Sequence, residues 1–172
     1  IEKHHCSVLF TEDEEIGGVG ADKFVHHSCI NGLEFNYAIE LDRRGKNDAV
    51  FYECDNPEFE DFITEDGDWK TEFGSYSDIC DVAPALGCAA VNLSCGYYNA
   101  HTKNEYVVFS EMENNIKKVC KLIERTTEDD KFEYIEAKHR WSKYEMYGGR
   151  DSEYYDYSSD VQYCFWITFV NL

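Results

Sequence analysis

The chain has 172 residues, with 16 Lys and Arg against 35 Asp and Glu, which gives a formal net charge of −19 at pH 7. This charge disfavours nucleic acid and anionic membranes as partners, because both recognise basic surfaces. Hydrophobic residues make up 43% of the chain, so a disordered acidic tail is excluded and a single domain over residues 1–172 is expected. The longest apolar run, from Cys164 to Val170, is too short to span a bilayer.

Eight cysteines are scattered along the chain, and no two of them form a CxxC pair. An even number of dispersed cysteines is typical of a disulfide framework, and so of a secreted, extracellular protein. We therefore predict that all of them are paired: Cys6, Cys29, Cys54, Cys80, Cys88, Cys95, Cys120 and Cys164. The sequon at Asn92 predicts N-glycosylation, which fits the same compartment. The alternative is a cytosolic protein with free thiols.

Alternating apolar residues predict several strands in chain order. The clearest runs from Phe35 to Leu41, with apolar odd-numbered residues toward the core and Glu34, Asn36 and Glu40 on the other face. Residues 42–48 are typical of a hairpin loop that leads into a second strand. Runs rich in aromatic and β-branched residues predict strands at 49–54, 88–95, 105–109, 132–137 and 163–170.

One segment, residues 110–125, has the apolar period of an amphipathic helix. Ser110 and Glu113 predict a capping box at its start, and Ile116 falls on the apolar stripe. Lysines and Arg125 in the later turns complement the helix dipole. The predicted fold is therefore mainly β, an antiparallel barrel or sandwich with one amphipathic α-helix packed against it.

The sequence carries no recognised catalytic or cofactor motif: no GxSxG, HExxH, P-loop or GxGxxG occurs. The doublets His4-His5 and His26-His27 lie near cysteines, but oxidised cysteines could not ligate zinc, so polar strand ends are the preferred interpretation. The acidic residues between Asp55 and Asp68 do not fit an EF-hand register and are interpreted as a solvated loop. We predict no enzyme activity, no cofactor and no metal.

Two stretches of the chain carry a similarity to a known family. The first contains Thr64-Glu65-Asp66-Gly67, Thr71, Tyr76-Ser77-Asp78 and Cys80-Asp81-Val82. The second contains Tyr106-Val107-Val108-Phe109, Asn115-Ile116 and Cys120, and Gly17-Gly18 ahead of Cys29 adds a third, shorter match. Together they resemble tick salivary lipocalins, the secreted histamine- and lipid-binding barrels of blood-feeding arthropods.

The resemblance implies a non-catalytic, secreted protein that captures a small amine or apolar ligand inside a barrel. It implies that the first stretch lies on consecutive strands and that Cys80 pairs with Cys120 of the helix. Val107 stands where the family has an acid that helps to hold an amine. With the strand alternation, the resemblance implies a cavity lined by Tyr37, Trp69, Tyr76, Asp78, Tyr106 and Phe109.

A second interpretation is an immune-evasion or effector module that binds a basic host protein, such as a chemokine, complement factor or protease. Residues 151–160 place three tyrosines among acids, either as an acidic loop between strands or as sulfated tyrosines in an anionic patch. The candidate contacts are Asp151, Glu153, Tyr154, Tyr155, Asp156 and Tyr157. A secreted hydrolase with paired carboxylates is a third class, which no residue spacing supports.

Overall fold

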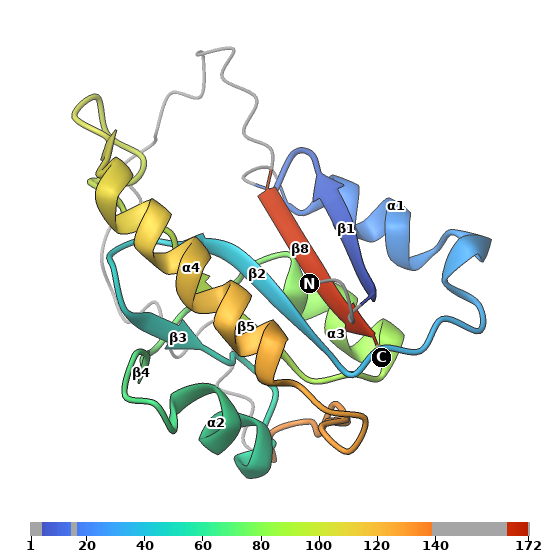
Figure 1. The fold of residues 1–172 in the computed structure, drawn as a ribbon. Helices are drawn as coiled ribbons and strands as arrows, with labels where there is room; N and C mark the ends of the chain where they lie inside the picture. Colours follow the sequence, from blue (N-terminus) through green and yellow to red (C-terminus); the bar gives the residue numbers. More distant parts are fainter. Residues whose placement is uncertain (1–4, 15–16, 139–164, 172) are drawn as a thin grey trace.

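A computed structural model describes residues 5–14, 17–138 and 165–171 of the chain. Its centre is an open, mixed sheet of six strands in the order β1-β8-β2-β5-β3-β4 (Figure 1). The pairs β2–β5 and β3–β4 are parallel, and the other neighbours are antiparallel. The strands are β1 (His5–Thr11), β2 (Tyr37–Arg43), β3 (Asp48–Val50), β4 (Lys70–Thr71), β5 (Ala90–Ser94) and β8 (Phe165–Asn171). A separate two-stranded ribbon pairs β6 (Tyr97–Tyr98) with β7 (Tyr106–Val107).

Helices cover both faces of the sheet. On one face, α1 (Val19–Val25) and α3 (Ile79–Leu86) pack in one hydrophobic cluster with β2, β5 and β8. On the other, α2 (Pro57–Thr64) and α4 (Phe109–Arg125) share a second cluster with the same strands. Figure 1 shows α4 in front of the sheet and α3 behind it. None of the helices in the described ranges is long and apolar enough to cross a membrane.

The prediction of a mainly β barrel or sandwich is wrong, because four helices enclose an open mixed sheet. Burial on both faces is the physical reason. Tyr37, Ala38, Ile39 and Glu40 are each no more than 1% exposed, so β2 is not the half-solvated strand that alternation suggested. The predicted hairpin of 35–41 with 49–54 is also wrong, since β5 lies between β2 and β3.

The other strand predictions are confirmed in part. Residues 88–95 contain β5, and residues 163–170 overlap β8. Residues 132–137 form two isolated bridges, Cys88 with Glu133 and Cys54 with Glu136, rather than a strand. The run 105–109 contributes only the short β7, because Phe109 already begins α4.

Two short helices lie where the sequence predicted a loop and a strand. The acidic stretch 55–68 contains α2, and Cys80 to Val82, expected on a strand, lie in α3. Asn56 caps α2 by accepting a hydrogen bond from the Phe59 amide at 3.1 Å, and Pro57 occupies the first turn. Each helix has eight residues, too few for a clear helical period in the sequence.

The amphipathic helix is confirmed as α4, but its details differ from the prediction. Val108 is the N-cap and makes no side-chain cap, so Ser110 is not part of a capping box. Ile116 is 41% exposed, whereas Leu122 and Ile123 are about 4–5% exposed and contact the sheet. The buried stripe therefore lies on a different side of the helix from Ile116.

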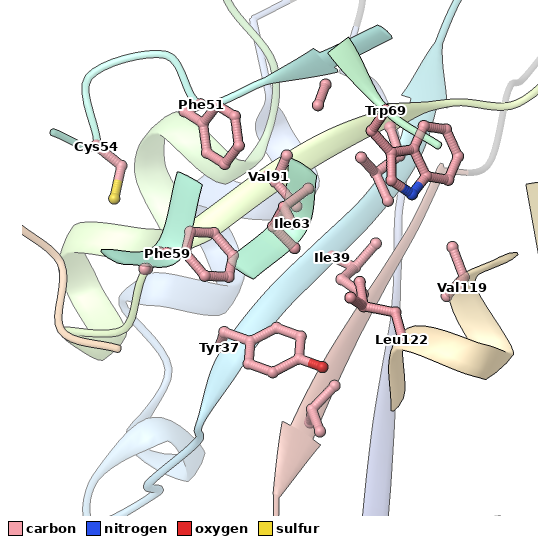
Figure 2. Close-up of a cluster of buried hydrophobic side chains, with 14 of the residues drawn as sticks. Tyr37, Ile39, Phe51, Cys54, Phe59, Ile63, Trp69, Val91, Val119 and Leu122 are labelled. Atoms are coloured by element: carbon pink, nitrogen blue, oxygen red, sulfur yellow. The ribbon is translucent and has the colours of Figure 1, made fainter. Parts of the chain in front are cut away.

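The cluster under α2 and α4 is rich in aromatic rings (Figure 2). Phe59 of α2 lies within 5.2–5.7 Å of the ring centres of Tyr37, Phe51 and Phe132. Trp69 is buried beside α4, with the Lys118 ammonium 4.6 Å from its ring centre. This cluster joins both helices to the centre of the sheet.

We expect the two helix starts to respond differently to loss of a polar side chain. Asn56→Ala should lower the free energy of unfolding by about 1–2 kcal/mol, because Asn56 caps α2 and also donates to the Glu133 carbonyl at 2.9 Å. Ser110→Ala should change it by less than about 0.5 kcal/mol, because Ser110 caps nothing. Urea unfolding of both variants measures the difference, and equal losses would contradict these helix boundaries.

Candidate functional site

Polar side chains gather at the carboxyl ends of the two parallel strands β2 and β5. The register pairs Glu40 with Asn92, and a bulge between Glu40 and Arg43 interrupts the ladder just beyond. The alternation along each strand places Glu40 and Asn92 on the face that α3 covers, next to Ala38 and Ala90 of the apolar cluster. In α/β sheets, the carboxyl ends of parallel strands are where ligand crevices form.

A pocket of about 860 Å³ opens beside these strand ends. Its walls come from the segment between β1 and α1 (Glu14 and Gly17), the end of β2 (residues 42–44), the loop at 73–76, and α3 (Asp81). Tyr52, Asn92, Tyr97, Ala100 and His101 complete the lining. Segments far apart in the sequence therefore meet around one space.

Asn92 holds the floor of this pocket together. Its Nδ2 donates to the Tyr52 hydroxyl and to the Ser77 hydroxyl, both at 3.1 Å, and its Oδ1 accepts from the Asp42 amide at 3.0 Å. Ser77 in turn donates to Glu40 Oε2 at 2.6 Å. One buried amide thus joins β2, the start of α3 and Tyr52 in a single hydrogen-bond network.

Two carboxyl groups lie buried behind the network. Glu40 and Asp78 are each 0% exposed, and Glu40 Oε1 and both Asp78 oxygens have no hydrogen-bond partner among the described residues. Burial raises the pKa of Glu40 well above its usual value, and nearby Asp42 and Asp78 raise it further. Burial also raises the pKa of Asp78. Both groups are thereby driven toward the neutral, protonated form.

The rim of the pocket combines tyrosines with acids. The Tyr76 hydroxyl donates to Asp81 Oδ2 at 2.7 Å, and the Tyr97 hydroxyl donates to the Asp42 carbonyl at 2.8 Å. Burial and the Asp81 carboxylate raise the pKa of Tyr76, so its hydroxyl keeps the proton that it donates. Arg43 pairs with Asp48 at 3.3 Å, which neutralises one of the cations at the rim.

This arrangement suits the binding of a cation better than proton transfer to a substrate. Aromatic faces and carboxylates together stabilise an ammonium group. Glu40 has the raised pKa of a general acid, but it does not line the pocket, and Ser77 and Asn92 hold the positions in front of it. No group of three or more His, Cys, Asp or Glu residues in the described parts of the chain is arranged to hold a metal ion.

The structure brings together only two of the six residues predicted to line a cavity. Tyr76 lines the pocket, and Asp78 lies buried beside it. Tyr37 and Trp69 belong to the apolar core on the opposite face of the sheet. Tyr106 and Phe109 are 50% and 75% exposed at the β6–β7 ribbon and the start of α4. The sheet formed by the described residues is open, so it does not enclose the barrel cavity that was predicted to contain all six.

The structure also bears on the predicted glycosylation site and on the predicted disulfide. Asn92 is 2% exposed, and its Nδ2, the atom that would carry a glycan, donates hydrogen bonds to Tyr52 and Ser77, so the folded structure does not support glycosylation there. Cys80 lies on α3 and Cys120 on α4, on opposite faces of the sheet, which excludes their pairing in this fold. Residues 151–157 of the basic-protein interpretation lie outside the described residues.

Sequence reasoning missed the residues that form the floor. Glu40 was assigned to solvent and Asn92 to a sequon, and both are buried. A signal existed: Asn92 is a polar residue within the run Ala89 to Leu93, whose other members are apolar.

Searches of family models, curated proteins and solved structures found no match to this chain.

Proposed function

We propose that the chain binds a small organic cation, an amine with an aromatic or apolar body, in the pocket at the ends of β2 and β5. The observation that supports it is the convergence of Asp42, Asp81, Tyr76 and Tyr97 around a space of about 860 Å³. A volume of this size accommodates a small molecule. The ligand class is the one expected from the sequence, but the site is an open crevice at a sheet end.

The charge of the chain supports a cationic ligand. A formal net charge of −19 attracts cations to the surface, and the lining acids draw an ammonium group into the pocket. Phe73 is 72% exposed at the rim, where its ring offers an apolar contact to the body of the ligand. An exposed aromatic ring beside acids is a favourable surface for an amine.

Tyramine and two relatives of similar shape test the ligand class. We expect isothermal titration calorimetry to show binding of tyramine, at least tenfold weaker binding of the neutral para-propylphenol, and none of the anionic para-hydroxyphenylacetate. The reason is that only tyramine carries the ammonium group that the carboxylates stabilise. Equal binding of tyramine and para-propylphenol, or preference for the anion, would contradict the proposal.

Substitutions of pocket residues test whether tyramine binds in this pocket. Asp81→Asn should weaken tyramine binding about tenfold, or about 1.4 kcal/mol, because it removes a carboxylate from the rim while keeping its shape. Phe73→Ala should weaken it to a similar degree through the lost ring contact. Asp129→Asn and Phe109→Ala are matched controls on exposed residues outside the pocket, and they should leave the affinity unchanged.

The binding of a basic host protein through residues 151–157 stays a prediction from the sequence, as does secretion. Both are compatible with the strong negative charge.

A further inference from the structure

Cys6 lies on β1, an edge strand of the sheet, and its side chain belongs to the α4 face. The ladder aligns Cys6 with Val170 of β8, and Val170 with Tyr37 of β2. Val170 and Tyr37 are both buried in the cluster beneath α2 and α4, and Cys6 packs against that cluster. The register therefore directs the Cys6 thiol toward the layer of helix α4.

Cys120 lies on the helix that covers this face. Its neighbours Val119 and Leu122 are buried in the same cluster, and Cys120 itself is half-buried. The C-terminal end of α4 is tied to β2, since the Tyr37 and Thr126 hydroxyls lie 2.6 Å apart. Burial and the nearby Cys120 thiol raise the pKa of Cys6, which is consistent with the two sulfur atoms being neighbours.

The other described cysteines have different surroundings. Cys95 directly follows β5, where its amide donates to the Arg43 carbonyl at 2.8 Å at the pocket end of the sheet. Cys80 and Cys88 belong to the α1 and α3 side of the sheet, and Cys54 lies near both, because it shares a small cavity with Cys80 and raises the pKa of Cys88. Cys29 is exposed in the short 3-10 helix Ser28–Ile30. Cys54 also belongs to the cluster against which Cys6 packs, but its neighbouring thiols are those of Cys80 and Cys88. Among the described cysteines, Cys120 is the one on α4, the helix that covers the face to which the Cys6 side chain belongs.

We propose that Cys6 and Cys120 form a disulfide bond that links the edge strand β1 to helix α4. Both are thiols in the structure, so bond formation is an oxidation. A small-molecule disulfide such as oxidised glutathione supplies it by exchange: one cysteine thiolate attacks the disulfide and releases one glutathione thiol. The second thiolate then displaces the other glutathione, so the two cysteines lose two electrons and two protons, and one glutathione disulfide becomes two thiols.

The link would stabilise the strand that begins one wall of the pocket. β1 pairs only with β8 within the described sheet, and the segment after it leads directly to Glu14 and Gly17. A disulfide across so long a segment of chain removes conformational freedom from the unfolded state and holds the edge strand in place. This inference stands independently of the proposed ligand.

Peptide mapping tests the pairing directly. The full chain is reduced, treated with oxidised glutathione, alkylated and digested with trypsin without reductant. Cleavage after Lys3, Lys23, Lys118 and Lys121 yields peptides 4–23 and 119–121, each with a single cysteine. We expect mass spectrometry to find these two peptides linked, and the link to disappear on reduction. Cys6 linked to another cysteine, or Cys6 and Cys120 both alkylated, would overturn the proposal.

Thermal unfolding gives a second readout. Oxidation should raise the melting temperature by roughly 5–15 °C in the native chain. Cys6→Ser and Cys120→Ser should each abolish the part of the melting-temperature increase that this bond contributes. The double variant should lose no more of the increase than either single variant. Cys29→Ser is the matched control and should keep the full increase, because Cys29 is exposed and does not belong to this cluster. Additive losses in the double variant would show that the two cysteines do not form one bond.

Discussion

Phe59→Ala should lower the free energy of unfolding by about 3–5 kcal/mol. Phe59 is 0% exposed, and Figure 2 shows its ring between those of Tyr37 and Phe51. The Phe132 ring is also in contact with it, so removal of Phe59 leaves a cavity at the centre of the cluster. With Ile63, it is one of the two buried residues through which α2 contacts the sheet. Urea unfolding followed by circular dichroism measures the loss as a shift of the midpoint.

Phe109→Ala is the matched control for this experiment. The same side chain is removed, but Phe109 is 75% exposed at the start of α4, so the expected change is within about 0.5 kcal/mol. Comparison of the two variants separates the effect of burial from the effect of removing a phenylalanine side chain. Similar losses in the two variants would contradict the position of α2 against the sheet.

Glu40→Gln should make the protein more stable than the native chain as the pH rises through neutrality. The pKa of Glu40 is raised in the folded state by burial and by Asp42, Asp78 and Glu14 around it. A raised pKa means that the folded chain binds the proton more tightly than the unfolded chain, whose glutamates have a pKa of about 4.3. The stabilisation is complete below that pH and is lost as the pH rises toward the folded pKa.

Glutamine mimics the protonated form and does not ionise, so the variant should lose this pH dependence. Urea unfolding at a series of values from about pH 5 to about pH 8 measures it as a flatter curve of free energy against pH. The pKa of Asp78 is also raised, so part of the pH dependence of stability remains in the Glu40→Gln variant. A slope identical to that of the native chain would show that Glu40 is not held in a desolvated site.

Glu34→Gln is the control, because it makes the same substitution at an exposed glutamate. Glu34 is exposed, and its hydrogen bond with Lys131 at 2.9 Å lowers its pKa. Its contribution therefore has the opposite sign: it is present at neutral pH and is lost as the pH falls through the folded pKa. Comparison of the two variants separates the effect of burial from the general effect of reducing a net charge of −19.

The two proposals concern different faces of one sheet. The pocket depends on Glu40, Asn92 and the start of α3, whereas the Cys6–Cys120 link lies in the layer of α4. They meet at β1, whose carboxyl end leads into the pocket wall. Substitutions on the α4 face and substitutions in the pocket therefore remove different contacts, and their effects can be compared.

Local pattern was sufficient for the elements whose apolar period is long. The helix at 109–125 and the strands β2, β5 and β8 follow directly from their spacing, because each is long enough or apolar enough to show it. The negative charge also follows from the sequence alone. Tyr76 and Asp78 were placed at the site by resemblance, and the structure has them at or beside the pocket.

Tertiary structure decided the fold class and the site. Alternation along β2 cannot reveal whether its second face meets water or helices, and the helices that cover it, α1 and α3, are too short to show a period. Glu40 was consequently assigned to solvent, although it is 0% exposed beneath the start of α3. The pocket itself depends on the parallel pairing of β2 with β5, in which Glu40 meets Asn92 from 52 residues further along the chain, and such non-local contacts leave no mark in the local sequence.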